Sequence, residues 1–158
     1  MMFIGREKQL DILNDQLTQV RQSGSGRFVW MRGRRRVGKS RLVEKFLATQ
    51  QIPFVFYQAP RRPPELALER FSTVVACSNL PNAASFKGER SSGSWPTALQ
   101  LAAAGATTST PIAIVLDELP YLVEHDPGFP SDLQFAWDHH LSRQPVLLIA
   151  IEIGRAHV

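Results

Sequence analysis

The sequence predicts an α/β fold with a mostly parallel sheet in a chain of 158 residues. Short apolar runs alternate with longer segments in which apolar residues recur every three or four positions, as on one face of a helix. One run, Ile112–Leu116, is apolar throughout, which is typical of a strand buried on both faces. Strands that alternate with helices pair in parallel, because each helix returns the chain to the same end of the sheet.

The first half of the chain contains three predicted helices and two predicted strands. Leu10, Leu13, Leu17 and Val20 form the apolar face of the first helix, which a Gly- and Ser-rich turn then breaks. A proline-rich turn follows the second strand. The predicted elements are a helix over 7–22, a strand over 27–32, a helix over 39–50, a strand over 53–57 and a helix over 65–77.

The second half begins with residues 78–95, which lack apolar periodicity and predict a long surface loop. The sole cysteine, Cys77, excludes an internal disulfide, and we expect it to be a small buried apolar residue. We expect Ser131 to cap the last helix. The predicted elements are a helix over 96–104, a strand over 112–116, a helix over 131–142 and a strand over 145–151.

Composition is that of an ordinary globular chain, with 44% hydrophobic and 20% charged residues. The longest apolar stretch, 145–151, is too short to span a bilayer, so we expect no membrane partner. Because a charged residue, Arg6, arrives before any apolar core develops at the N-terminus, we expect no signal peptide and a cytoplasmic protein. The net charge of +4 is concentrated between Arg32 and Arg41, a basic patch that would attract nucleotides or nucleic acids alike.

The segment Gly33-Arg34-Arg35-Arg36-Val37-Gly38-Lys39-Ser40 fits the phosphate-loop pattern G-x-x-x-x-G-K-[ST] at every fixed position. A predicted strand precedes it and a predicted helix follows it, as this motif requires. Its glycines let consecutive backbone N–H groups turn toward one anion, and the helix that begins near Lys39 adds its positive end. We therefore predict that residues 33–41 bind ATP, with Lys39 reaching the β- and γ-phosphates and Ser40 a ligand of Mg²⁺.

The three arginines in this loop have two interpretations. Arg34, Arg35 and Arg36 could be solvated side chains that only add positive potential, or they could contact phosphates or an acidic partner. The first is favoured, because a phosphate loop binds through backbone amides.

The apolar strand over 112–116 ends in two carboxylates, Asp117 and Glu118. Paired with the phosphate loop, Asp117 is expected to hold Mg²⁺ alongside Ser40. Glu118 would be the general base that polarises the water attacking the γ-phosphate. With Lys39, it is a predicted catalytic residue. The Asp117-Glu118 pair favours hydrolysis over transfer of the phosphoryl group to another substrate. Taken alone, Asp117 would more simply be a strand-end cap.

Three motifs together resemble the archaeal-type ATPase family of the AAA-type P-loop NTPases, which also occurs in bacteria. The motifs are Phe3-Ile4-Gly5-Arg6-Glu7-Lys8-Gln9-Leu10, the arginine-rich phosphate loop, and Leu116-Asp117-Glu118-Leu119-Pro120-Tyr121-Leu122. The resemblance implies a P-loop NTPase core with the phosphate-loop strand in the middle of the sheet. It also implies that Phe3, Ile4 and Gly5 line the pocket for the adenine base. A helix lead-in whose Phe3 and Ile4 plug the core is the equally weighted alternative.

The resemblance implies Mg²⁺-dependent ATP binding and hydrolysis. Two alternatives stay open: a nucleotide-dependent signalling switch with little turnover, and a DNA-associated ATPase that uses the arginine patch. Family members follow the fourth strand with a polar sensor residue, whereas this chain continues as Glu152-Ile153-Gly154-Arg155-Ala156-His157-Val158.

That heptapeptide resembles the in-frame translation of a sequencing-library adapter. We therefore expect residues 1–26 to be a lead-in with a helix, 27–151 a partial ATPase core truncated after its fourth strand, and 152–158 a non-native tail. A homo-oligomer or protein partner would then be recruited through a region beyond residue 151.

Overall fold

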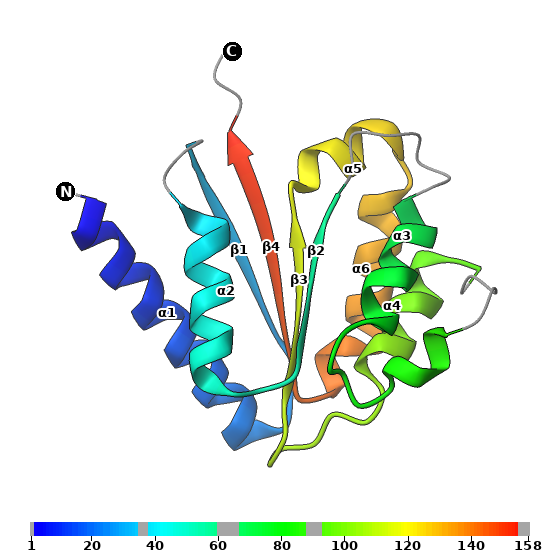
Figure 1. The fold of residues 1–158 in the computed structure, drawn as a ribbon, viewed down its shortest axis with the longest axis horizontal. Helices are drawn as coiled ribbons and strands as arrows, with labels where there is room; N and C mark the ends of the chain where they lie inside the picture. The colour runs from blue at the N-terminus through cyan, green and yellow to red at the C-terminus, as the bar shows by residue number, and fades with distance from the viewer. Residues whose placement is uncertain (1, 35–37, 60–66, 88–92, 155–158) are drawn as a thin grey trace.

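The computed structural model describes residues 2–34, 38–59, 67–87 and 93–154; within these ranges it does not describe the side chains of 2–7, 33–34, 125 and 153–154. Four parallel strands form one sheet, in the order β1-β4-β3-β2, with helices on both faces (Figure 1). The strands are β1 (Arg27–Arg34), β2 (Phe54–Gln58), β3 (Ile112–Asp117) and β4 (Val146–Gly154). All three strand pairs are parallel, which confirms the predicted fold class.

Helices α1 (Met2–Ser23) and α2 (Lys39–Gln50) cover one face of the sheet (Figure 1). Leu13, Leu17 and Val20 of α1 are fully buried there, so the predicted apolar face of this helix is confirmed. The helix begins five residues earlier than the sequence pattern indicates.

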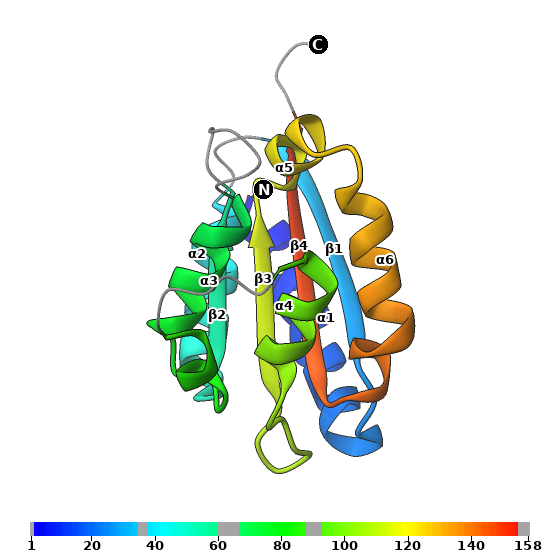
Figure 2. The same ribbon diagram turned by 90° about the vertical axis from the view of Figure 1, so that its right-hand side faces the viewer.

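Helices α3 (Ala67–Ala76), α4 (Trp95–Ala103) and α6 (Phe129–His139) cover the other face (Figure 2). Four aromatic rings join these helices to β2, with centroids 5.1–5.9 Å apart: Tyr57, Phe71, Trp95 and Phe129. Tyr57 is buried and donates its hydroxyl to the carbonyl of Ala67 at 2.9 Å. This cluster therefore fixes β2 against the helical layer.

Short helices occupy two segments that the sequence analysis leaves without structure. Helix α5 (Leu119–His125) follows β3 directly, and a 3₁₀ helix, η2 (Ala83–Phe86), interrupts the predicted loop. Phe86 is buried, so an isolated aromatic residue anchors this segment without any periodic pattern. A second 3₁₀ helix, η3 (Leu141–Arg143), leads into β4.

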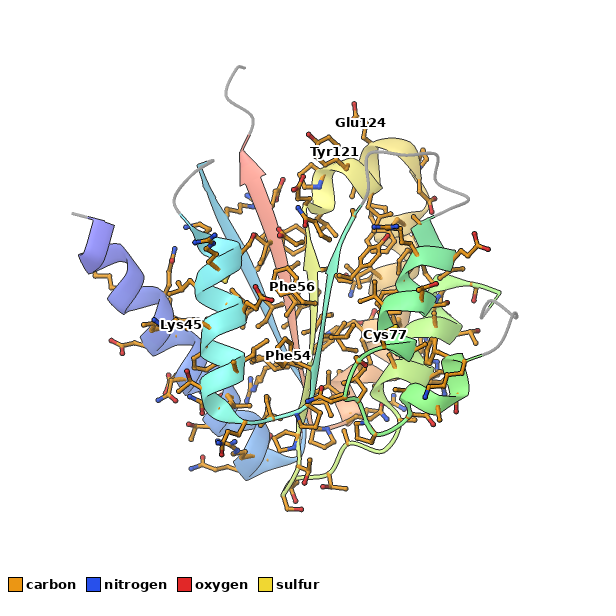
Figure 3. The ribbon with its side chains drawn as sticks, viewed as in Figure 1. Lys45, Phe54, Phe56, Cys77, Tyr121 and Glu124 are labelled. Carbon is orange, nitrogen blue, oxygen red and sulfur yellow. The ribbon has the colours of Figure 1, made fainter. Side chains whose placement is uncertain are left out.

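Two predictions for the helical layer are wrong. Ser131 lies in the first turn of α6, and Gly128 is the N-cap. Asp126 accepts a hydrogen bond from the backbone N–H of Gly128 at 3.2 Å, and this turn starts the helix earlier than Ser131 would. Cys77 is exposed in the turn after α3, because the buried face of that helix ends at Val75 (Figure 3).

Strand β1 lies at the edge of the sheet, and no described residue pairs with its outer side. The resemblance implies that the phosphate-loop strand lies in the middle of the sheet. In the described sheet it lies at the edge instead, and β4 and β3 are the central strands. Trp30 of β1 is 44% exposed and donates its indole N–H to Glu152 at 2.9 Å. Glu152 also pairs with Arg32 at 3.1 Å. Strand β4 thus continues three residues beyond its predicted end, while the origin of residues 152–158 stays a prediction.

No helix in the described ranges is long and apolar enough to cross a membrane.

Candidate functional site

The described residues of the phosphate loop and of the acidic strand end lie at the carboxyl end of the parallel sheet, where α2 begins and where α5 lies over the end of β3 (Figure 1). Strand β1 runs through Gly33 and Arg34, whose backbones pair with Ile153 and Gly154. The strand is therefore two residues longer than predicted, because β4 extends alongside it. Arg35, Arg36 and Val37 lie outside the described residues, so the two interpretations of the arginines stay predictions.

Gly38 ends the loop and is the N-cap of α2. It adopts left-handed backbone angles, with φ 72° and ψ 25°, which favour glycine at this position. Its carbonyl accepts the first helical hydrogen bond, from the N–H of Leu42 at 2.9 Å. Gly38 has no side chain to cap the helix, so the N–H groups of its first turn, from Lys39 to Arg41, are left for another acceptor. Such a helix N-terminus favours an anion.

Lys39 and Ser40 are the first two residues of α2. The Lys39 side chain is only 7% exposed, and burial lowers its pKa from the ordinary value of 10.5. A buried ammonium group is stabilised by a nearby anion, which suits a lysine that binds phosphate. Arg41, in the same turn, is exposed.

Ser40 contacts Asp117 across 77 residues of sequence. Its hydroxyl donates to Asp117 Oδ2 at 2.6 Å, which joins the start of α2 to the end of β3. Asp117 is 2% exposed. Burial raises its pKa, hydrogen bonds from Ser40 and from the N–H of Glu118 lower it, and the charge of Glu118 raises it again. The net effect is a raised pKa, which means that the ionised form of this carboxyl group is disfavoured in the folded chain until a cation binds beside it.

The donor set at this contact fits Mg²⁺. Ser40 and Asp117 present a hydroxyl and a carboxylate oxygen, and oxygen ligands are those that Mg²⁺ prefers. The magnesium ion keeps several waters when it binds to proteins, so two protein ligands and a nucleotide are enough to hold it.

Glu118 is the N-cap of α5 and has a left-handed backbone, with φ 57° and ψ 43°, which is uncommon for a residue other than glycine. Its carboxylate accepts a hydrogen bond from the Gln58 side-chain amide at 2.5 Å. Gln58 belongs to none of the sequence motifs that predict the site. Only its position could have indicated a role in the site, because it is the polar residue that ends the second apolar strand. In the folded chain it lies in register with Asp117.

Phe3, Ile4 and Gly5 lie in the first turns of α1. Their side chains lie outside the described part of the chain. The base-pocket interpretation and its core-plug alternative therefore both stay predictions.

Comparison with known proteins shows the fold. No protein-family model and no curated protein sequence matches the chain. Among solved structures, the chain is similar to Cdc6p from Pyrobaculum aerophilum, with a TM-score of 0.58 and 16% sequence identity. The match covers 94% of this chain and 39% of that chain. The chain therefore has an α/β fold, with four parallel strands in one sheet, that is similar to part of Cdc6p.

Proposed function

We propose that the chain binds Mg–ATP and hydrolyses it to ADP and phosphate. The observation that carries this proposal is the 2.6 Å contact between Ser40 and Asp117, which joins the phosphate-loop helix to the acidic strand end. A hydroxyl and a buried carboxylate at this place form a metal site next to a helix N-terminus that favours phosphate. The AAA+ fold and the phosphate-loop pattern support the same assignment.

Each residue has one role in this reaction. The first-turn amides of α2 and the Lys39 ammonium bind the phosphates, while Ser40 and Asp117 hold the metal. When bound, Mg²⁺ neutralises the charge that develops on the phosphate oxygens. Glu118 accepts a proton from water as its oxygen bonds to the γ-phosphorus, and the bond from that phosphorus to the bridging oxygen breaks.

Binding is tested with Lys39→Ala. Titration calorimetry with Mg–ATP should show at least about a tenfold loss of affinity, since a charge-assisted contact to phosphate contributes on the order of 1.5–3 kcal/mol. Lys45→Ala is the matched control, because Lys45 is an exposed lysine of the same helix (Figure 3). Equal affinity in all three proteins would contradict the proposed binding site.

Hydrolysis is tested with Glu118→Gln, which keeps the shape of the side chain and removes the base. We expect the turnover rate to fall about a hundredfold or more while Mg–ATP affinity is retained. The alternative, a nucleotide-dependent switch with little turnover, has one specific observation in its favour, since Gln58 engages the Glu118 carboxylate. Equally slow hydrolysis in wild type and variant would favour that alternative.

A further inference from the structure

A cavity of about 180 Å³ lies between α1 and β1. Helix α1 lines it with Gln9, Ile12 and Leu13. Strand β1 lines it with four consecutive residues, 29–32. We call this space the edge cavity.

The edge cavity lies along the outer edge of β1. Successive side chains of a strand point to opposite faces of the sheet. Met31 packs into the cluster formed with α1 and α2, whereas Trp30 lies on the other face, where Phe28 links it to Trp137 of α6. Residues from both faces can line one cavity only where it opens at the edge of the strand. In the sheet order, β4 and β1 lie between Asp117 and this edge, so about 10 Å separates the edge cavity from the proposed metal site.

The size and the walls of the edge cavity suit one flat ring. Ile12 and Leu13 are apolar residues on the α1 wall. For comparison, an apolar cavity of about 150 Å³ holds one benzene molecule. Trp30, which is 44% exposed, adds an aromatic side chain on which a nucleobase can stack.

Polar groups favour a nucleobase over an apolar side chain as the ligand. Alternate residues of a strand direct their N–H and C=O groups to the same side, so β1 presents both donors and acceptors along its outer edge. On the facing wall, the Gln9 amide offers a donor and an acceptor. A nucleobase carries donors and acceptors on its edge and can pair with such groups, whereas an apolar side chain would leave them unpaired.

Arg32 supplies positive charge at the edge cavity. Its side chain is 74% exposed, its Nε pairs with Glu152 at 3.1 Å, and its guanidinium carbon lies 5.7 Å from the centre of the Trp30 ring. A guanidinium group has five N–H donors, so it can pair with a carboxylate and bind a phosphate at the same time. The net charge of +4 also attracts an anionic ligand to the chain.

We propose that the edge cavity is a second nucleotide site, in which a nucleobase binds between α1 and the edge of β1 and the phosphate of the same nucleotide binds Arg32. The site is separate from the one proposed for Mg–ATP and does not rest on that function. Its phosphate ligand is an arginine, so binding does not require Mg²⁺. Free mononucleotides and single-stranded nucleic acid share this chemistry, and the experiment uses one probe of each kind.

Binding is measured by titration calorimetry in EDTA, on the Lys39→Ala chain, which lacks the lysine of the proposed ATP site. The two probes are AMP and a single-stranded hexamer of deoxyadenylate. We expect one AMP molecule to bind per chain. A hexamer that binds at least about tenfold more tightly than AMP would identify nucleic acid as the ligand, and a hexamer that binds no more tightly would identify free nucleotides.

The position of the site is tested with Ile12→Glu, which places a negative charge on the cavity wall at an exposed residue. We expect AMP affinity to fall at least about tenfold, with an unchanged melting temperature. Asn14→Glu is the matched control, because it adds the same charge at an exposed residue of α1 that does not line the edge cavity. Its AMP affinity should change less than about twofold.

Recognition of the base is tested with Gln9→Ala and with ribose 5-phosphate, which carries the phosphate without a base. We expect Gln9→Ala to weaken AMP binding about threefold or more, and ribose 5-phosphate to bind at least about tenfold more weakly than AMP. Ribose 5-phosphate that binds as tightly as AMP would overturn base recognition. Failure of both nucleotide probes to bind, or equal weakening by Ile12→Glu and Asn14→Glu, would overturn the site itself.

Discussion

Asp117 is a buried carboxyl group whose pKa is raised. Burial is the largest cause of its raised pKa, relative to an ordinary value of 3.8. A carboxyl group with a raised pKa keeps its proton in the folded chain over a pH interval in which the unfolded chain has released it. Its contribution to stability is therefore greatest below pH 3.8 and is lost as the pH rises through the folded-state pKa.

Asp117→Asn should consequently stabilise the metal-free chain at neutral pH. We expect its free energy of unfolding to exceed that of wild type at about pH 7, with the difference shrinking toward about pH 4. Urea denaturation in EDTA across this range measures the difference. Asp15→Asn, on the exposed surface of α1, controls for removal of a surface charge. A wild type that is more stable at every pH would contradict this account.

At the scale of single residues, the sequence motifs identify Ser40 and Asp117 as site residues but do not identify Gln58. The phosphate-loop pattern and the acidic strand end single out Ser40 and Asp117, and the folded chain brings them to 2.6 Å. Gln58 belongs to no motif. Its contact with Glu118 depends on the register of β2 against β3, which is set by packing of the whole sheet and is not readable from local spacing.

Among the helices and strands, those with a strong apolar repeat are predicted from the sequence, and the short helices are not. The apolar faces of α1 and α2 predict both helices, and the four strands follow from their apolar runs. Helix α5 has seven residues, too few to show a repeat, and starts at a left-handed Glu118 that no residue preference predicts. Helix α6 begins before the predicted Ser131 cap, because the turn at Asp126 precedes that serine.

Gly26 lies in the junction between α1 and β1. A Cβ at Gly26 would lie 2.3 Å from the carbonyl oxygen of Leu141, a backbone atom of η3. Gly26→Ala should therefore lower the free energy of unfolding by about 2 kcal/mol, because the two segments must separate. At Gly128 the nearest atom would be 3.6 Å away, so Gly128→Ala is the control and should cost less than about 1 kcal/mol. Equal losses measured by urea denaturation would contradict the packing argument.

For the whole molecule, the two helical layers close around a sheet whose centre is fully buried. All six residues of β3 are buried, and the same apolar run predicted a parallel sheet from sequence. The strand order was not predictable in the same way. It depends on which strands β4 separates, which long-range packing decides and local sequence spacing does not record.

Ligand binding should stabilise this whole unit. If Mg–ATP binds only the folded chain, a concentration about 100 times the dissociation constant adds about 2.7 kcal/mol of stability. For a domain of this size, that corresponds to a rise of about 5–10 °C in melting temperature. Differential scanning calorimetry of wild type and Lys39→Ala measures it. The same rise in both proteins would show that the stabilising ligand binds elsewhere.

The position of β1 also affects the colloidal behaviour of the protein. Among the described residues no strand pairs with the outer edge of β1. An unpaired strand edge is a template on which another extended chain can add, and Trp30 gives such an encounter an apolar contact. Glu152 offsets the charge of Arg32, but Arg27 leaves net positive charge along the same strand, so two such edges repel one another. That repulsion weakens as salt screens it. Concentrated solutions of this chain should consequently stay monodisperse longest at low ionic strength.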